Sequence, residues 1–514
     1  MPAQIAVLAD IHLSDAPGSP QEAALVYALN RLREEKPDVV LVLGDATAAG
    51  TLDSAGRVRT MLEASGLCYR MIPGNSDRRS PDLASAVIDK LTVDTPFCTE
   101  AYAVCLLDTH DGKVCPQGKN YLKTLTESTQ PRPIVLASHY PIEICMKDPY
   151  VRSLVERGEI ALYIGAHVHR DQGCQIGKMP AHTVRGLDPD KAIGGVPAIA
   201  LFELEDQTWQ TSDLPFEDGT VAHWSPSMRQ DFIDHLGFSC MLTSLEGLRH
   251  AALSGVRCVE LKAHYALTDP RAELLSAIRR WRGSGGRYLS MHMPDLTYDS
   301  ESSTITGVGA FQEAVSLALT LEADHVLLHV PRVSVDRMQP DGEVWAGLAS
   351  TSLALIREPM ARGMVIGVGN LHMNAGEPAD GARGFGYLPL ECPEWVESFR
   401  ASSGYDRIGI HLDIGHARNN LPFSHSYTLG QWYALVGREL VGYHLHQVKV
   451  KDGLMVNHFP ITDVHGPLIS LSSFFWGWKT GTLRHAPIFL EVRGDSSQDA
   501  VNSLRCIRRH VREA

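Results

Sequence analysis

The chain of 514 residues is too long for one ordinary hydrophobic core, and its length favours about two to four domains. With 44% hydrophobic and 21% charged residues, its composition is that of a folded globular protein and excludes a disordered chain. The formal net charge of −13 gives no general attraction for nucleic acid or for an anionic membrane surface.

We expect neither a leader peptide nor a membrane span. The N-terminal MPAQIAVLAD leads directly into a strand-like run, and no stretch reaches the roughly 18 uninterrupted apolar residues of a spanning helix. The ten cysteines are scattered and form no CxxC pair. This pattern predicts reduced thiols in a cytoplasmic protein rather than a disulfide framework or a zinc ribbon.

Residues 1–213 are predicted to form one layered α/β domain. Short apolar runs alternate with amphipathic segments such as QEAALVYALNRLREEK and SAGRVRTMLEAS up to about residue 170. Further short strands, including PAHTVRG and VPAIALFEL, follow to about residue 212 and should complete the sheets.

Five apolar runs of this domain end on side chains that bind metal ions: AVLAD, DVVLVLGD, YRMIPGN, IVLASH and LYIGAHVH. Loops at the C-terminal ends of strands commonly build the site of an α/β protein. One Gly-Asp pair usually belongs to an ordinary turn. The ordered set instead favours a centre for two divalent ions, which needs a shared carboxylate and several neutral ligands. The candidate ligands are Asp10, His12, Asp45, Asn75, His139, His167 and His169.

On these motifs, residues 1 to about 212 resemble the calcineurin-like metallophosphoesterase superfamily. The resemblance implies a β-sandwich flanked by helices, two divalent ions such as Mn, Fe or Zn, and phosphoester hydrolysis by a hydroxide held between them. It implies that Asp10, His12 and His169 hold the first ion and that Asn75, His139 and His167 hold the second. By the same resemblance Asp45 bridges the ions, and the catalytic residues are Asp45, Asn75 and His139.

The sequence departs from this family at two positions. Many members have a histidine after the asparagine of the third motif, where this chain has Ser76. A serine hydroxyl is not a comparable acid, so we expect catalysis mainly by the ions, with better leaving groups or an acid from elsewhere. Ala166 replaces a usual glycine without loss of a ligand. Asp77 either supports the ligands or caps the next helix, and the sequence leaves both roles open.

Residues 214–230 lack periodicity and are predicted to be a linker to a second domain, residues 231–514. Eight apolar strand candidates follow, with helix-like segments between them: FSCML, CVELK, YLSMH, HVLLHV, MVIGVGN, IGIHLD, LVGYHLH and IFLEV. Eight such units in about 280 residues predict a (β/α)₈ TIM barrel. The expected fold class is therefore α/β throughout.

Ligand-type side chains recur at the predicted C-terminal ends of the barrel strands, where such barrels keep their sites. On LDIGHA and FLEVR, the second domain resembles the xylose-isomerase-like superfamily, which includes sugar epimerases and the endonuclease IV type of apurinic endonuclease. That resemblance implies metal binding by Asp413, His446 and Glu491, with His292, His329 and His416 available for further ions or substrate. The loop after the seventh strand offers either His458 or the pair Asp463 and His465 as additional ligands.

One departure in the barrel puts proton-transfer chemistry in doubt. The fifth strand of this superfamily normally ends in a glutamate, where this chain has Gly369 followed by Asn370. His372 could substitute as a ligand. Three interpretations stay open: a site with one metal ion that acts on a sugar-like part of the substrate, a binding or dimerisation module, and a nuclease-like multi-zinc site.

The leading hypothesis is a metal-dependent phosphoesterase that hydrolyses a phosphodiester or phosphomonoester of a small, sugar- or nucleotide-like molecule. The barrel would bind or process the organic part. The alternative is a nuclease or DNA-repair enzyme, which the acidic charge disfavours. A scaffold with vestigial sites is a third hypothesis. We expect a small-molecule partner and no membrane, and exposed barrel helices are compatible with a homodimer.

Overall fold

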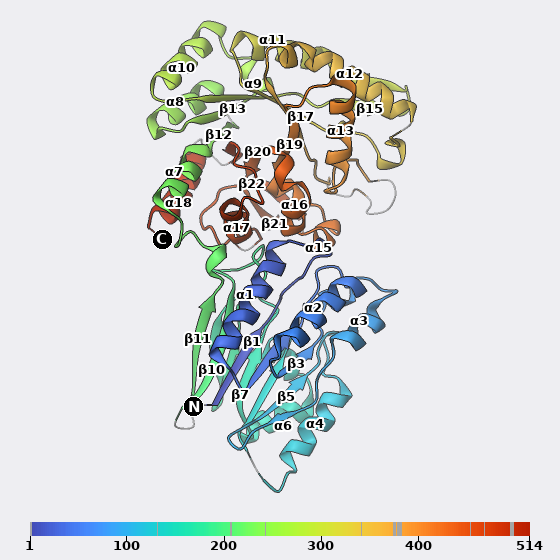
Figure 1. Cartoon of the computed structure of the whole chain (residues 1–514), viewed down its shortest axis with the longest axis vertical. Helices are drawn as coiled ribbons and strands as arrows, with labels where there is room; N and C mark the ends of the chain where they lie inside the picture. Colours follow the sequence, from blue (N-terminus) through green and yellow to red (C-terminus); the bar gives the residue numbers. More distant parts are fainter. Residues whose placement is uncertain are drawn as a thin grey trace. The chain divides into compact units, whose positions relative to one another are not determined.

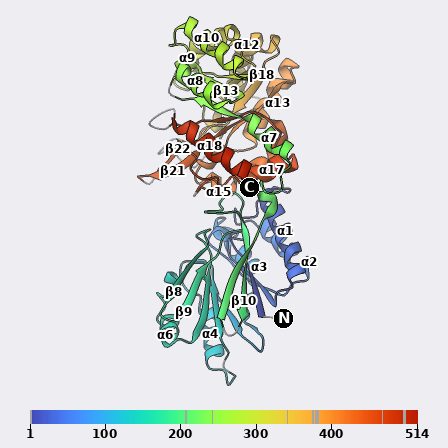
Figure 2. The same ribbon diagram turned by 90° about the vertical axis from the view of Figure 1, so that its left-hand side faces the viewer.

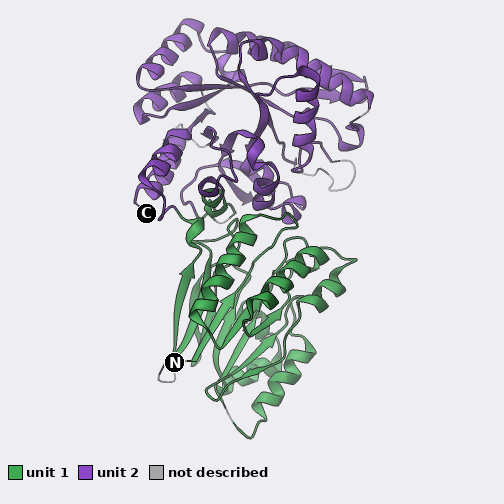
Figure 3. Ribbon diagram, viewed as in Figure 1, with its two compact units in different colours: residues 1–220, 465–476 green, residues 221–464, 477–514 purple. Residues whose placement is uncertain are grey.

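The chain divides into two compact units, shown in Figure 3: residues 1–220 with 465–476, and residues 221–464 with 477–514. The computed structural model describes residues 3–130, 132–205, 208–241, 243–340, 342–373, 377, 383–452, 454–466, 468–493 and 498–513.

Two sheets form the framework of unit 1 (Figure 1). The first has the order β11-β10-β1-β2-β3, with bounds β1 Ala3–Leu8, β2 Val39–Leu43, β3 Tyr69–Ile72, β10 Ala198–Glu205 and β11 Thr208–Pro215. The second has the order β4-β5-β6-β7-β9-β8, with bounds β4 Phe97–Cys98, β5 Ala103–Leu107, β6 Ile134–Ser138, β7 Ile160–Gly165, β8 Gln172–Ile176 and β9 Met179–Thr183.

The central strands of both sheets are buried on both faces. In β2, Leu41 belongs to the core between the sheets, while Val40 and Val42 face the core under the helices. The helices that cover the first sheet are α1 (Pro20–Glu35), α2 (Leu52–Ser65) and α3 (Ala84–Leu91). Those beside the second are α4 (Pro116–Thr126), α5 (Ile142–Cys145) and α6 (Pro149–Arg157). The predicted β-sandwich flanked by helices is confirmed.

Parallel pairing of β1 with β2, of β2 with β3, of β5 with β6 and of β6 with β7 explains how distant motifs meet. Parallel strands end at a common edge, so the loops after β1, β2, β3, β6 and β7 lie at one end of the sandwich. All five metal-ligand motifs of the sequence fall in these loops.

Unit 2 contains the predicted closed barrel of eight strands (Figures 1 and 2). Every neighbouring pair is parallel, and β12 closes the ring on β23 with Leu236 opposite Ile488. The strands are β12 Leu236–Cys240, β13 Cys258–Lys262, β14 Tyr288–His292, β17 His325–His329, β18 Val365–Gly369, β19 Ile408–Asp413, β20 Leu440–Leu445 and β23 Ile488–Leu490.

Helices and two hairpins lie before, between and after the barrel strands in the sequence. The longer helices are α7 Pro226–His235, α8 Ser244–Ser254, α10 Arg271–Gly283, α11 Val308–Thr320, α12 Glu343–Ala361, α13 Glu391–Ser403, α16 Leu429–Val436, α17 Ser472–Thr480 and α18 Gln498–Glu513. The short ones are α9 Ala263–Ala266, α14 Ile414–Arg418 and α15 Phe423–Ser426. The hairpins are β15 Thr297–Asp299 with β16 Thr304–Thr306, and β21 Gln447–Lys451 with β22 Leu454–Phe459. No described helix is long and apolar enough to cross a bilayer.

The stretch 214–230 carries more structure than a linker needs. It includes the end of β11, the 3₁₀ turn Glu217–Gly219 and the start of α7, where the Ser225 hydroxyl accepts a hydrogen bond from Met228 N–H. The boundary between the units falls inside this stretch, after Thr220.

Candidate metal centres

Six of the seven candidate ligands of unit 1 form two groups at the common strand edge. Within each group, one ligand atom per residue lies within 4.8 Å of the others. The first group is Asp10, His12 and His169, and the second is Asp45, His139 and His167. The seventh candidate, Asn75, joins the second group, because its Oδ1 lies 3.0 Å from His139 Nε2.

Asp45 faces both groups with a different oxygen. Its Oδ2 lies 3.5 Å from His12 Nε2, and its Oδ1 lies 3.4 Å from His139 Nε2. A carboxylate that presents one oxygen to each of two ligand sets has the geometry of a bridging ligand.

The spacing of the donor atoms fits divalent ions. His12 Nε2 and His169 Nε2 are 3.4 Å apart, and His139 Nε2 is 3.2 Å from His167 Nδ1. Two donors on one ion at about 2.1 Å each are separated by roughly 3 to 3.5 Å at right or tetrahedral angles. In addition, Asp10 Oδ1 is buried and has no hydrogen-bond partner among the described residues. The residues present therefore fit a pair of ions.

The backbone at the ligands is held in an uncommon conformation. Asp10, His12, Asp45, His167 and His169 all have φ between 48° and 71°. Such values are unfavourable for non-glycine residues and are kept only where the surrounding structure enforces them. Two motif glycines allow this packing: a Cβ at Gly44 would lie 2.6 Å from His139 Nδ1, and one at Gly74 would lie 2.3 Å from Asp45 N.

Burial keeps the outer histidine rings neutral, as metal ligands require. It lowers the pKa of His169 to about 3 and the pKa of His12 well below its usual value. Burial also raises the pKa of Asp10 to about 8. For Asp45, burial is outweighed by the His139 ring and the Ser76 N–H, which hold the carboxyl pKa below its usual value. The positive charge near the Asp10 carboxylate is thus too small to offset the cost of burying it.

Ser76 and Asp77 form hydrogen bonds with the loops that carry the candidate ligands. The Ser76 hydroxyl donates to Thr47 O at 2.7 Å, and its N–H donates to Asp45 Oδ1 at 2.7 Å. Asp77 caps no α-helix; its carboxylate accepts from the N–H groups of Gly74, Thr47 and Ala46. Of the two roles considered for Asp77, the structure therefore shows the first: Asp77 supports the loops that carry Asp45 and Asn75.

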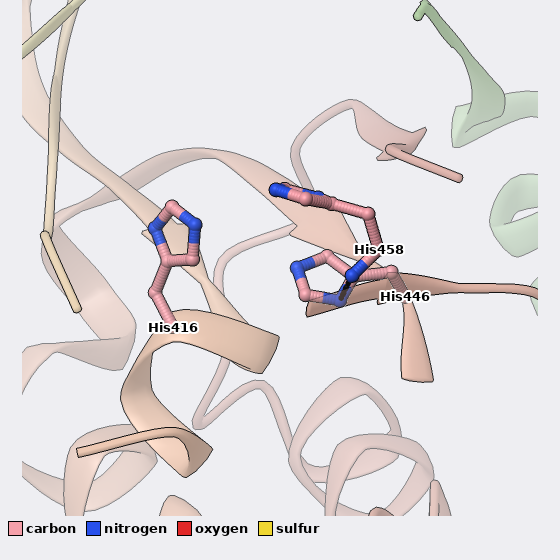
Figure 4. Close-up of side chains that lie close together, drawn as sticks. All are labelled: His416, His446 and His458. Carbon is pink, nitrogen blue, oxygen red and sulfur yellow. Dashed lines mark hydrogen bonds between the residues drawn. The ribbon is translucent and has the colours of Figure 1, made fainter. Parts of the chain in front are cut away.

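In the barrel, His416, His446 and His458 form a further group of ligand atoms within 4.8 Å. Figure 4 shows the three rings close together; His416 lies on α14, His446 directly follows β20, and His458 lies on β22. His416 Nε2 has no hydrogen-bond partner in the described part of the chain, while His446 Nε2 lies 3.1 Å from Asp413 Oδ1. Burial lowers the pKa of His416 well below its usual value and that of His458 to about 4. This group can hold one ion.

A second buried cluster in the barrel contains residues that the sequence analysis missed. Lys262 Nζ lies 2.5 Å from Glu491 Oε1 and 3.5 Å from Glu260 Oε1. His444 links the same carboxylates, with Nδ1 2.7 Å from Glu491 Oε2 and Nε2 2.8 Å from Glu260 Oε1. Both oxygens of Glu491 therefore lie close to a lysine or histidine nitrogen, and Glu491 also belongs to a group of possible metal ligands with His292 and His444. The overlooked signal was a glutamate and a lysine within the apolar run of β13.

The remaining barrel candidates take different places. His329 Nδ1 lies 2.7 Å from Asp295 Oδ1, and a Cβ at Gly369 would lie 2.7 Å from His329 Cδ2, so His329 fills the space a side chain there would need. His292 stacks beside His444, with ring centroids 5.7 Å apart. The rings of His372 and His416 have centroids 4.6 Å apart.

His458 joins the histidine group, whereas the alternative ligand His465 belongs to unit 1. There its Nδ1 lies 3.3 Å from the Ser470 hydroxyl.

One family model matches part of the chain. Residues 3–171 match the model of the calcineurin-like phosphoesterase family. No curated protein matches the chain. Among solved structures, a dimetal phosphatase from Danio rerio is 15% identical, with 42% of this chain and all 100% of that chain covered and a TM-score of 0.31.

Two further solved structures are similar to this chain. Endonuclease IV from Thermus thermophilus is 16% identical, with 55% of this chain and 100% of that chain covered and a TM-score of 0.38. A 3-keto-D-glucoside 4-epimerase from E. coli is 11% identical, with 54% and 98% covered and a TM-score of 0.38. The chain thus combines residues 3–171, which match the calcineurin-like phosphoesterase family, with an eight-stranded parallel barrel in unit 2.

Proposed function

We propose that this protein hydrolyses a phosphodiester or phosphomonoester of a small, sugar- or nucleotide-like molecule, using two divalent ions in unit 1. The observation that carries the proposal is the placement of Asp45 with one oxygen toward each of two ligand groups. That arrangement suits a pair of ions clamping one phosphoryl group.

The proposed ligands are the seven residues of the sequence analysis. When bound, two divalent ions supply Lewis acidity toward the phosphoryl oxygens and lower the pKa of water. Manganese, iron, zinc and related ions all accept these histidine, carboxylate and amide ligands. The His139 Nδ1–H donates to Leu43 O at 2.9 Å, which leaves Nε2 facing Asn75 and Asp45. His139 is thereby held in the tautomer that a ligand needs.

Two cationic side chains lie close enough to affect the ligand charges. Burial lowers the pKa of His12 most, and the positive charge of Lys191 lowers it further. The Arg79 guanidinium is partly buried and attracts the carboxylates of Asp45 and Asp77. Positive charge beside a phosphoester site favours an anionic substrate. The buried hydroxyl of Ser76 is committed to Thr47, so we propose that leaving-group protonation comes from another residue, solvent or the substrate.

We assign the barrel the recognition or processing of the organic part of the substrate. Support comes from the histidine group at the strand ends, which is the face on which such barrels keep their sites. The proposed location is cytoplasmic, supported by ten cysteines that are all free.

The test is hydrolysis of an aryl phosphodiester and an aryl phosphomonoester by the whole chain loaded with manganese, zinc or iron. Asp45→Asn should abolish hydrolysis with the circular dichroism spectrum unchanged. Asp171→Asn, at an exposed position beyond the last motif, serves as the matched control. Full activity of Asp45→Asn would overturn the proposal.

A further inference from the structure

Residues 465–476, here called the return segment, belong to unit 1 although they follow the seventh barrel strand in the sequence. Trp476 is only 8% exposed and lies in the core cluster that contains Phe216, Leu25 and Val58. A Cβ at Gly219 would lie 3.4 Å from Ser472 Cβ, which marks a second close contact. The return segment is therefore a structural part of the phosphoesterase unit.

A loop of residues 186–194, here called the clamp loop, touches two ligands of the first ion. Asp188 N–H donates to Asp10 O at 3.0 Å, and Ile193 N–H donates to His169 O at 3.2 Å. At Gly186, an added Cβ would lie 2.8 Å from His169 Nδ1 and 3.1 Å from Asp10 Cβ. The clamp loop thus joins two residues whose backbones both have positive φ.

The return segment is hydrogen-bonded to the clamp loop at two points. Ser470 N–H donates to Asp190 O at 3.0 Å, and Gly194 N–H donates to His465 O at 3.3 Å. Within the return segment, His465 and Ser470 pair as an antiparallel bridge, and Ser470 is 1% exposed. Contacts therefore run from the return segment through the clamp loop to Asp10 and His169.

We infer that the return segment is a positioning element for the first ion of the phosphoesterase centre. It fixes the clamp loop, and the clamp loop holds Asp10 and His169 in their strained conformation. The hydrogen bonds of the clamp loop end on Asp10 and His169, both of the first group, so binding of the first ion depends on the return segment more than binding of the second. This inference rests on the proposed two-ion site and adds a requirement that no ligand residue reveals.

The first experiment compares Ser470→Pro with Ser470→Ala in the whole chain. Proline removes the N–H that bonds to Asp190, whereas alanine keeps it. Metal-free protein is titrated with Co²⁺, and the absorption of each ion is identified with His169→Ala and His167→Ala as references. We expect Ser470→Pro to lower the affinity for the first ion roughly tenfold, as loss of a residue that supports a metal ligand does. The affinity for the second ion should not change. Ser470→Ala should bind both ions as the wild type does.

Two outcomes of this titration overturn the inference. One is an unchanged affinity for the first ion in Ser470→Pro, and the other is an equal loss of affinity for both ions. A wild type that binds no ion in unit 1 would instead refute the proposed function, so the two failures are distinguishable.

A second measurement needs no variant and covers the case in which Ser470→Pro does not fold. Because coupling is reciprocal, metal binding must stabilise docking of the return segment. Hydrogen exchange of the peptide spanning residues 465–476 should slow on metal loading, although the return segment contains no proposed ligand of the centre. Identical exchange with and without metal would overturn the inference.

Discussion

His12 Nε2 lies 3.4 Å from His169 Nε2, and their rings stack with centroids 5.2 Å apart and an angle of 9° between planes. Burial favours the neutral form of both rings. Two neutral imidazole nitrogens that face each other beside the Asp10 carboxylate form a site suited to a cation.

We predict that His169→Ala lowers the metal content of the whole chain by one ion. The substitution removes one nitrogen of the first group and leaves the second group intact. Inductively coupled plasma mass spectrometry of the metal-loaded protein measures the count. His182→Ala on β9 is the control, because that ring packs against Phe202 and belongs to neither group. An unchanged count in His169→Ala would remove this residue from the ligand set.

Asp77→Ala is expected to destabilise unit 1 strongly. The carboxylate is fully buried and accepts hydrogen bonds from three backbone N–H groups and from the Thr47 hydroxyl. Leaving these donors unpaired should lower the free energy of unfolding by about 2–4 kcal/mol. Guanidinium denaturation compares this variant with Asp82→Ala, whose side chain is exposed. Equal stabilities would mean that water replaces the carboxylate without cost.

Gly369→Ala should destabilise the barrel because its Cβ would lie 2.7 Å from His329 Cδ2. Overpacking of this kind costs about 1–3 kcal/mol. The cost should largely disappear in a His329→Ala background, and a double-mutant cycle measures this coupling. Additive effects of the two substitutions would show that His329 is not what excludes a side chain at position 369.

Lys262→Met should destabilise the barrel by about 3–5 kcal/mol, because it leaves two buried carboxylates without their ammonium partner. His444 and Lys262 outweigh burial and hold the pKa of Glu260 and Glu491 well below the usual 4.5. A lowered pKa in the folded state adds stability that is complete above pH 4.5 and is lost as the pH falls further.

Denaturation of Lys262→Met across this acid range should therefore show a weaker pH dependence than the wild type. Lys451→Met, at an exposed position of β21, is the control for removal of a positive charge. A variant as stable as the wild type would mean that His444 alone compensates both carboxylates.

The sequence could predict where the candidate ligands of unit 1 gather, because each lies within four residues of the end of a buried strand. Once those strands are parallel, their ends must converge, so Asp10, Asp45 and His139 meet without any knowledge of side-chain contacts. The barrel was predictable for a similar reason: eight apolar runs with helices between them admit few other arrangements.

Contacts between residues far apart in the sequence could not be predicted from local patterns. Lys262 and Glu491 are 229 residues apart in the sequence, and they pair across β12, which separates β13 from β23 in the closed ring. Asp77 could equally have capped a helix, because the same side chain bonds to backbone N–H groups in both roles. The choice depended on the positions of Gly74 and Thr47, which only the folded chain specifies.

The chain passes between the two units three times, after Thr220, Val464 and Trp476. No single cut can separate the units without removing part of one of them, so a fragment ending at residue 220 would lack Trp476 from its own core. Two domains joined end to end would be connected by a single crossing of the chain. With three crossings, neither unit corresponds to one uninterrupted stretch of the chain.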